Sequence, residues 1–245
     1  METKRTIVIG DPHGCLEEFQ NLLGKVGWRK SIDRLVVAGD LVDRGPDSIG
    51  LIRFVKLNNI ECAMGNHEHK YVRFYKHELK SSKSGYVNPM KFNHEKLELY
   101  RKMSNEDLEF LAQLPTKIKI GNNLWVIHGG LDCTKAFSDQ VDDKLIYTRY
   151  VKANGEAISG DSYNKEQSAK HWTDVWQGPE SIVYGHFVHS LGYPRIVQPR
   201  PGVRMWGIDT GCCFGGKLTA ISFPDETIYQ VNALKEYKVW RNNNE

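Results

Sequence analysis

Five short apolar segments in this chain of 245 residues each run into a glycine-containing turn that carries an aspartate, an asparagine or a histidine. The segments have the length of buried strands, and segments with apolar residues at helical spacing separate the first three of them. Strands that alternate with helices predict a mainly parallel α/β core, whose carboxyl strand ends lie at one edge of the sheet and bind ligands there. The five turns are Gly10–Gly14 (GDPHG), Gly39–Gly45 (GDLVDRG), Gly65–Glu68 (GNHE), His128–Gly130 (HGG) and Gly185–His186 (GH).

The first half of the chain reads as three strand and helix units. Strands are predicted at Thr6–Ile9, Leu35–Ala38 and Glu61–Met64, ahead of the first three turns. A helix over Cys15–Gly27 follows the first strand, and a second helix follows the second strand with Pro46 in its first turn.

Helical patterns replace the alternation from Lys70 to Pro115, where Ser104–Asp107 is a capping signature. We interpret this region, about 68–115, as a helical cap inserted into the core. Residues 153–174 are polar and poorly periodic, which predicts a long loop or lid. No repeat, low-complexity tract or linker interrupts the sequence, so we expect residues 1–245 to form one domain.

The remaining apolar segments predict further strands. A hairpin is expected over Lys117–Ile127, and a strand at Ser181–Tyr184 leads to the last turn. The final three segments, Arg204–Ile208, Lys217–Phe223 and Thr227–Val231, are expected to form an antiparallel ladder.

Composition argues against several classes of partner. The net charge of +3 is the remainder of 33 basic and 30 acidic residues, so it gives no indication of a nucleic-acid or membrane partner.

Met1–Arg5 runs directly into a strand pattern without a signal-peptide core, which favours a cytoplasmic protein. The five cysteines include no CxxC pair, and we expect them to be reduced. A redox pair at Cys212 and Cys213 is less favoured than two small residues that fill tight space.

The polar residues of the five turns form an inventory of nitrogen and oxygen donors. Such donors suit Mn, Fe, Zn or Co better than a metal selected by thiolates. The set is large enough for two ions, and two-metal sites use a shared ligand, for which Asp40 on the central motif is the candidate. Each motif alone is weak, because Gly-Asp turns are common and a single histidine at a strand end is usually structural. The predicted ligands are Asp11, His13, Asp40, Asn66, His128 and His186.

These motifs, in this order, resemble those of the calcineurin-like metallophosphoesterases. The extension Val42–Arg44 in the second motif resembles the phosphoprotein phosphatase branch, and the segment Ile208–Ala220 is similar to small lambda-type Ser/Thr protein phosphatases and diadenosine tetraphosphatases of bacteria and phages. The resemblance extends from Gly10 to about Ala220. It implies an α/β fold in which a central β-sandwich of mixed sheets is flanked by helices. Pro12 and Phe187 depart from the family pattern without removing a donor.

The resemblance also implies roles for individual residues. One metal would be held by Asp11, His13 and Asp40, and the other by Asp40 with the three remaining ligands. Asp43 and His67 would form the catalytic pair. The substrate phosphate would be bound by Arg44, by Asn66 and by a second arginine, for which we choose Arg149. The cofactor expected is a pair of divalent ions, Mn first, with Fe, Zn, Co and Ni as alternatives.

The expected reaction is hydrolysis of a phosphomonoester. A hydroxide that bridges the two metals would attack phosphorus, and His67, oriented by Asp43, would protonate the leaving oxygen. A phosphorylated protein is the first substrate expected, with phosphoserine or phosphothreonine as the target. The alternative is a diadenosine tetraphosphate or related nucleotide. A catalytically inactive scaffold is a third reading, against which stands the complete ligand set.

Two features near the third motif have competing interpretations. The cap carries many basic residues with few acids among them, which form either a rim that attracts phosphorylated substrates or, as we favour, a solvated helix face. His69 makes the run resemble a metal-binding HxH, but a packed or solvated side chain is preferred, and Glu68 is expected to start the cap as a partner of the ligands. The basic residues of the cap are Lys70, Arg73, Lys76, Lys80, Lys83 and Lys91.

Overall fold

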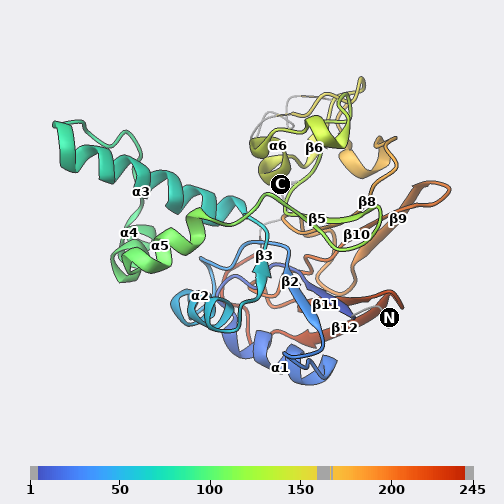
Figure 1. Cartoon of the computed structure of the whole chain (residues 1–245), viewed down its shortest axis with the longest axis horizontal. Helices are drawn as coiled ribbons and strands as arrows, with labels where there is room; N and C mark the ends of the chain where they lie inside the picture. The colour runs from blue at the N-terminus through green and yellow to red at the C-terminus, as the bar shows by residue number, and fades with distance from the viewer. Residues whose placement is uncertain (1–4, 159–165, 167, 241–245) are drawn as a thin grey trace.

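Two mixed five-stranded sheets form the centre of the computed structural model, which describes residues 5–158, 166 and 168–240 (Figure 1). In the first sheet, with order β12-β11-β1-β2-β3, the last three strands are parallel, β11 pairs antiparallel with β1, and β12 pairs antiparallel with β11. The bounds are β1 Thr6–Ile9, β2 Arg34–Val37, β3 Glu61–Cys62, β11 Lys217–Phe223 and β12 Thr227–Asn232.

The second sheet has the order β4-β5-β8-β10-β9. Its three central strands are parallel, and an antiparallel strand lies at each edge. Buried side chains from both sheets, such as Val8, Val36, Val126 and Val183, form one apolar cluster that packs the sheets together. The bounds are β4 Lys117–Lys119, β5 Leu124–Ile127, β8 Ser181–Tyr184, β9 Arg195–Arg200 and β10 Val203–Gly207.

Helices cover the outer faces of this sandwich. Helices α1 (Leu16–Val26) and α2 (Ser48–Leu57) bury apolar stripes in the same cluster as the outward side chains of β1 and β2. A separate apolar cluster on the outer face of the second sheet contains Trp172 and Trp176, both buried as expected for core residues. The smaller elements near it are η1 Phe137–Asp139, α6 Asp142–Tyr147, β6 Tyr150–Val151, β7 Lys170–His171 and η3 Trp172–Asp174.

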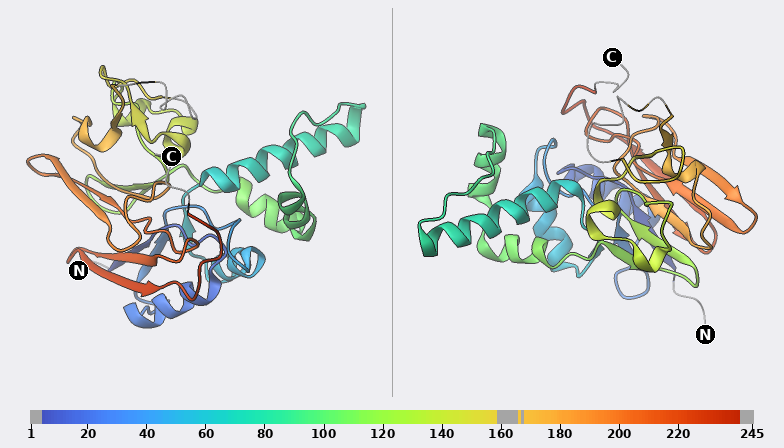
Figure 2. Two further views of the ribbon diagram at one scale, coloured as in Figure 1. Left: turned by 180° about the vertical axis from the view of Figure 1, so that it is seen from behind. Right: turned by 90° about the horizontal axis from the view of Figure 1, so that it is seen from above.

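A helical cap projects from the sandwich beside β3 (Figures 1 and 2). It consists of α3 (Asn66–Ser84), α4 (His94–Lys102) and α5 (Asn105–Ala112). Phe74 of α3 stacks on Phe92 with ring centroids 4.2 Å apart, which fixes the segment before α4 against α3. The helix-capping signature predicted at Ser104–Asp107 is confirmed, since Ser104 and Asp107 form a reciprocal capping box at the N-terminus of α5.

Several local predictions were wrong in instructive ways. The core is not mainly parallel, because β11 pairs antiparallel with β1. Strand β10 belongs to the second sheet and not to a ladder with β11, and the edge strand β9 was not predicted. Pro46 precedes the helix, whose N-cap is Asp47.

Two boundaries also differ from the prediction. The cap starts at Asn66, two residues before the predicted start, so the third motif lies inside the first turn of α3. The predicted 153–174 loop includes β7 and η3 at its end, whereas residues 159–165 and 167 lie outside the described residues. No helix in the described part of the chain combines the length and apolarity needed to cross a membrane.

Candidate metal centre

The parallel strands of both sheets deliver the predicted ligands to one edge of the sandwich. Asp11 follows β1, Asp40 follows β2, and Asn66 follows β3 as the first residue of α3. From the second sheet, His128 follows β5 and His186 follows β8. Because the central strands run parallel within each sheet, all five turns belong to carboxyl strand ends.

Asp40 lies at the middle of the cluster. It belongs to two groups of donors whose atoms lie within 4.8 Å of one another, one with His13 and His67 and one with His128 and His186. A carboxylate common to two groups is the arrangement that a bridging ligand requires. The structure thus brings Asp40 to the position that the sequence analysis gave it.

Asp11 contacts His186 and His128, which belong to the donor group that lacks His13. Its Oδ2 accepts from the backbone N–H of His186 at 2.8 Å, and its Oδ1 lies 4.0 Å from Nδ1 of His128. That buried Oδ1 has no hydrogen-bond partner. An orphaned carboxylate oxygen among other donors fits a cation ligand, because leaving it unpaired in the interior is costly.

The ring orientations of the histidines also fit metal ligation. Nδ1 of His13 donates to the carbonyl of Val42, and Nδ1 of His128 donates to the carbonyl of Ala38, each at 2.9 Å. A neutral ring held in this way presents the lone pair of Nε2 to the cluster. Nε2 of His128 then lies 2.9 Å from Oδ1 of Asn66, so two acceptors face each other. Such a pair suits a shared cation.

Burial and local charge set the protonation of the donors. Burial lowers the pKa of His13 well below its usual value, with a further contribution from the Arg44 guanidinium, and burial acts likewise on His186. Burial alone would raise the pKa of Asp40, but the imidazoles nearby hold it well below its usual value. Neutral imidazoles and an ionised carboxylate are the forms that ligate metals.

The pKa of Asp11 shifts in the opposite direction to that of Asp40. Burial, followed by the charges of Asp209 and Asp40, raises its pKa well above the ordinary value for aspartate. Asp209 is buried directly after β10 and was not among the predicted site residues, although Asp209–Gly211 is a further acidic turn at a strand end. Three buried carboxylates this close require compensating positive charge, which divalent ions would supply.

Backbone strain is concentrated at the same place. Among the described residues, seven non-glycine residues have a positive φ angle, and five of them belong to the predicted motifs. Strained conformations of this kind persist where the surroundings fix them, commonly at functional sites. Gly185 is required for space, because an added Cβ would lie 2.0 Å from Oδ1 of Asp11. The five residues are His13, Asp40, Asp43, Arg44 and His186.

His67 and Asp43 form the pair expected from the sequence. Nδ1 of His67 lies 2.5 Å from Oδ2 of Asp43, and its Nε2 faces the cluster, 3.9 Å from Oδ2 of Asp40. Two cap residues complete the surroundings of Asp43, since the hydroxyl of Tyr71 donates to Oδ1 at 2.5 Å and the ammonium of Lys96 contacts Oδ2. Neither had been singled out as a site residue, because no local motif marks them.

Glu68 holds three parts of the site together. Its Oε2 accepts from the backbone N–H groups of Asp40 and Gly65, and its Oε1 accepts from that of Val42, all within 3.1 Å. Burial, with the charge of Asp40, raises the pKa of Glu68 to about 8. The sequence analysis treated Glu68 as a partner of the ligands, and the contacts are of that kind.

Arg44, the first of the two arginines chosen for phosphate binding, contacts the cluster. Nη1 of Arg44 is 2.5 Å from Nε2 of His13, and its guanidinium stacks over the ring of Phe214 at 4.9 Å. For Arg149, the second choice, the relation to the cluster is electrostatic: its charge, after burial, helps to lower the pKa of His186. His69, by contrast, lies 3.0 Å from the hydroxyl of Tyr147 and belongs to neither donor group.

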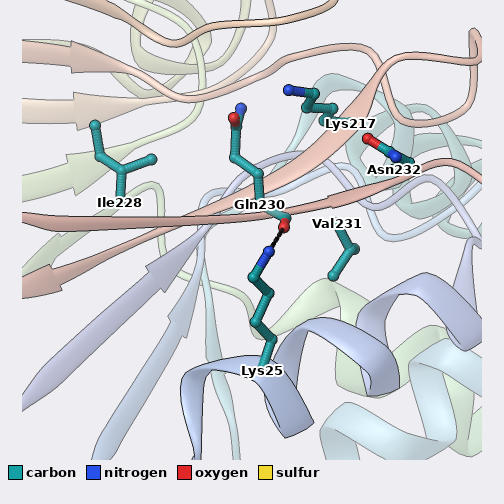
Figure 3. A pocket seen from close by; sticks show the side chains of 6 residues that line it. All are labelled: Lys25, Lys217, Ile228, Gln230, Val231 and Asn232. Carbon is teal, nitrogen blue, oxygen red and sulfur yellow. Dashed lines mark hydrogen bonds between the residues drawn. The ribbon is translucent and has the colours of Figure 1, made fainter.

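Another pocket lies away from this cluster. This hollow has a volume of about 460 Å³ and lies between α1 and β12. The ammonium of Lys25 donates there to the carbonyl of Gln230, at 2.7 Å (Figure 3). None of the predicted site residues lines it. The donors at the strand ends therefore remain the candidate site.

Comparison with known proteins places the chain among hydrolases of phosphoric esters. A family model described as calcineurin-like phosphoesterase matches residues 4–207. A bis(5′-nucleosyl)-tetraphosphatase PrpE of the asymmetrical type from Bacillus subtilis is 30% identical, with 93% of this chain and 94% of the relative covered. The corresponding Oceanobacillus iheyensis protein is 29% identical over 94% of this chain and 93% of its own.

Solved structures give the same picture at the level of the fold. A crystal structure of a candidate diadenosine tetraphosphatase superposes with a TM-score of 0.77 at 29% identity and covers 98% of this chain and 96% of that one. A yeast Ser/Thr phosphatase similar to human phosphatase PP5 superposes with a TM-score of 0.59 at 20% identity, covering 98% of this chain and 82% of that one. The second likeness shows the fold alone.

Proposed function

The chain belongs to the calcineurin-like phosphoesterase family, and on that premise we propose that it is a divalent-metal-dependent hydrolase of dinucleoside tetraphosphates. The observation that supports the hydrolytic chemistry is the pair of donor groups that share Asp40. The substrate class is supported by relatives of nearly the same length whose printed activity is bis(5′-nucleosyl)-tetraphosphate hydrolysis. The proposal keeps the cytoplasmic location predicted from the sequence.

This proposal exchanges the order of the two substrates expected from the sequence. The motif series is shared by protein phosphatases and tetraphosphatases, so the motifs could not separate them. The relatives that cover more than nine-tenths of the chain are tetraphosphatases, whereas the likeness to a Ser/Thr phosphatase is confined to the fold. The comparisons therefore favour the reading that had been the alternative.

The residues of the chain fit such a reaction. Asp11, His13, Asp40, Asn66, His128 and His186 would hold two ions, with Asp40 between them. When bound, two divalent ions would activate a water molecule and neutralise charge on the phosphoryl group.

Substrate handling is assigned to residues beside this cluster. The guanidiniums of Arg44 and Arg149 would bind phosphoryl oxygens, with help from the amide of Asn66. His67 would deliver a proton to the oxygen of the departing phosphate, while Asp43 holds the ring in place.

Steady-state kinetics with Mn²⁺ provide the test. The kcat/KM for diadenosine tetraphosphate is expected to exceed the values for a phosphoserine peptide and for 4-nitrophenyl phosphate by about two orders of magnitude, since binding energy from the whole substrate contributes. A chelator control should abolish all three activities. A phosphopeptide preferred over the dinucleotide would overturn the substrate assignment, and activity that survives chelation would overturn the metal assignment.

A further inference from the structure

One lysine of the helical cap contacts the catalytic pair, and a second lies near it on α3. Lys96 of α4 lies 53 residues from Asp43 in sequence, yet its ammonium contacts Oδ2 of Asp43 and lies 5.2 Å from the centre of the Tyr71 ring. This places a cap side chain beside the carboxylate that holds His67.

Lys70 lies next to the same place by helix geometry. It follows His67 by three residues on α3, so both side chains lie on one face of the helix. Its side chain is partly buried, and burial followed by the nearby charge of Lys96 lowers its pKa, with a smaller effect from Arg44. A lysine in contact with Asp43 and a partly buried lysine one helical turn from His67 therefore belong to the part of the cap beside the catalytic pair.

The position of His67 tells which part of the substrate would meet these lysines. A general acid must lie within hydrogen-bond reach of the leaving oxygen, so the leaving group occupies the side of His67. For phosphoserine that group is a neutral alcohol and needs no cation. For a dinucleoside tetraphosphate it is a nucleoside polyphosphate, which carries several negative charges.

We propose that Lys70 and Lys96 form a subsite on the cap that binds the phosphates of the departing nucleotide and so selects dinucleoside polyphosphates over phosphomonoesters. This assignment rests on the proposed function. In the reaction the water oxygen bonds to phosphorus, the P–O bond to the bridging oxygen breaks, and the bridging oxygen keeps the electron pair. His67 supplies a proton to that oxygen, and the water proton returns to solvent.

The subsite assigns a function to basic residues that were expected to form a solvated helix face. Lys70 departs from that expectation, because its side chain is partly buried and follows His67 by three residues on α3. Lys91, on the segment before α4, is exposed and serves as a matched control within the cap. The difference between the two positions separates a specific subsite from a general effect of positive charge.

Inhibition of the manganese-loaded enzyme by inorganic phosphates tests the subsite independently of dinucleotide hydrolysis. With 4-nitrophenyl phosphate as the reporter substrate, the Ki of tripolyphosphate should rise about tenfold in Lys70→Met and in Lys96→Met, and more in the double variant. The Ki of orthophosphate should change less than twofold. Lys91→Met should leave both values unchanged, and Lys96→Arg should restore tripolyphosphate binding.

Three outcomes would overturn the proposal. One is an unchanged Ki of tripolyphosphate in the double variant. Another is a parallel rise in both Ki values, which would indicate damage to the metal centre. The third is a lower kcat in Lys96→Met with both Ki values unchanged, because Lys96 would then only position Asp43. If wild-type enzyme cleaves the aryl phosphate but no dinucleotide, the proposed function fails while the inhibition data still decide on the subsite.

Discussion

The turns around Asp40 and the helical cap lie side by side but are built on different physical principles. In the turns, charged and polar side chains are almost completely buried, with exposures of 2% for Asp40 and 0% for His128. In the cap, helix α4 has no buried residue at all. Buried polar groups must satisfy one another, so the turns have few alternative arrangements, whereas exposed side chains of the cap can change with little cost to folding. If the cap binds the substrate as proposed, chemistry and selectivity can be altered separately.

The largest effect is expected from Asp40→Asn, which removes the charge common to both donor groups. We predict that the bound manganese falls from two ions per chain to one or none, and that kcat/KM falls about a thousandfold or more on every substrate. Metal analysis after gel filtration and steady-state kinetics measure the two quantities.

The matched control for this change is Asp139→Asn, because Asp139 is exposed on η1 and hydrogen-bonds only locally, to Ser138. It should retain both ions. If Asp40→Asn also retained both ions at full affinity, Asp40 could not be their shared ligand. The contrast between the buried turns and the exposed cap would then not rest on Asp40.

His67→Asn should produce a smaller effect that depends on the leaving group. Proton transfer by a side chain contributes roughly 10²- to 10⁴-fold when the leaving oxygen is basic. A phosphoserine peptide should therefore lose about a hundredfold or more in kcat, while a tetraphosphate, whose leaving oxygen belongs to a more acidic phosphate, should lose about tenfold. Metal content should not change.

His69→Asn is the control for that variant, since His69 lies two residues further along α3 and contacts Tyr147 instead of the cluster. Its kinetics should match those of the wild type. Equal losses on both substrates in His67→Asn would argue that His67 holds metal or substrate and donates no proton.

The sequence predicted most of the site because its signal is local. A glycine next to an acid or a histidine at the end of an apolar run marks a tight turn at a carboxyl strand end, and Gly39 with Asp40 shows both features with positive φ angles. The sheet then brings those strand ends together. The β-α units in the sequence already predicted this for the first sheet. Strand β9 and the placement of β10 were missed because pairing partners are not written in a strand's own residues.

The cap contacts were not predictable in this way. Lys96 reaches Asp43 across 53 residues, and Tyr71 reaches it across 28, and neither carries a flanking motif. Contacts of this kind depend on how α4 packs on α3 through Phe74, Phe92 and Tyr100, which pattern reasoning does not resolve. Motifs therefore identified the candidate metal centre and left the proposed subsite on the cap undetermined.

Glu68→Ala should reveal how strongly the turns depend on one buried carboxylate. The change leaves three buried backbone N–H groups, those of Asp40, Val42 and Gly65, without their acceptor. We predict a loss of about 3 kcal/mol in the free energy of unfolding, measured by urea denaturation of the metal-free protein. Glu68→Gln keeps an acceptor of the same shape and should lose less. Equal stability of both variants and the wild type would show that the turns are held by other contacts.

The smallest effect is expected in the cap itself, from Ser104→Ala. The hydroxyl of Ser104, the N-cap of α5, accepts from the N–H of Asp107 at 3.1 Å. Asp107 in turn contacts Arg53 of α2, so this N-cap motif links α5 to the sandwich. Losing one N-cap costs about 1 kcal/mol, and hydrogen exchange should accelerate in α5 first. Bound metal and turnover of 4-nitrophenyl phosphate should remain at wild-type values, because no ligand or catalytic side chain lies on α5. A loss of metal in this variant would mean that the cap and the turns unfold as one unit, and the separation of chemistry from selectivity would not hold.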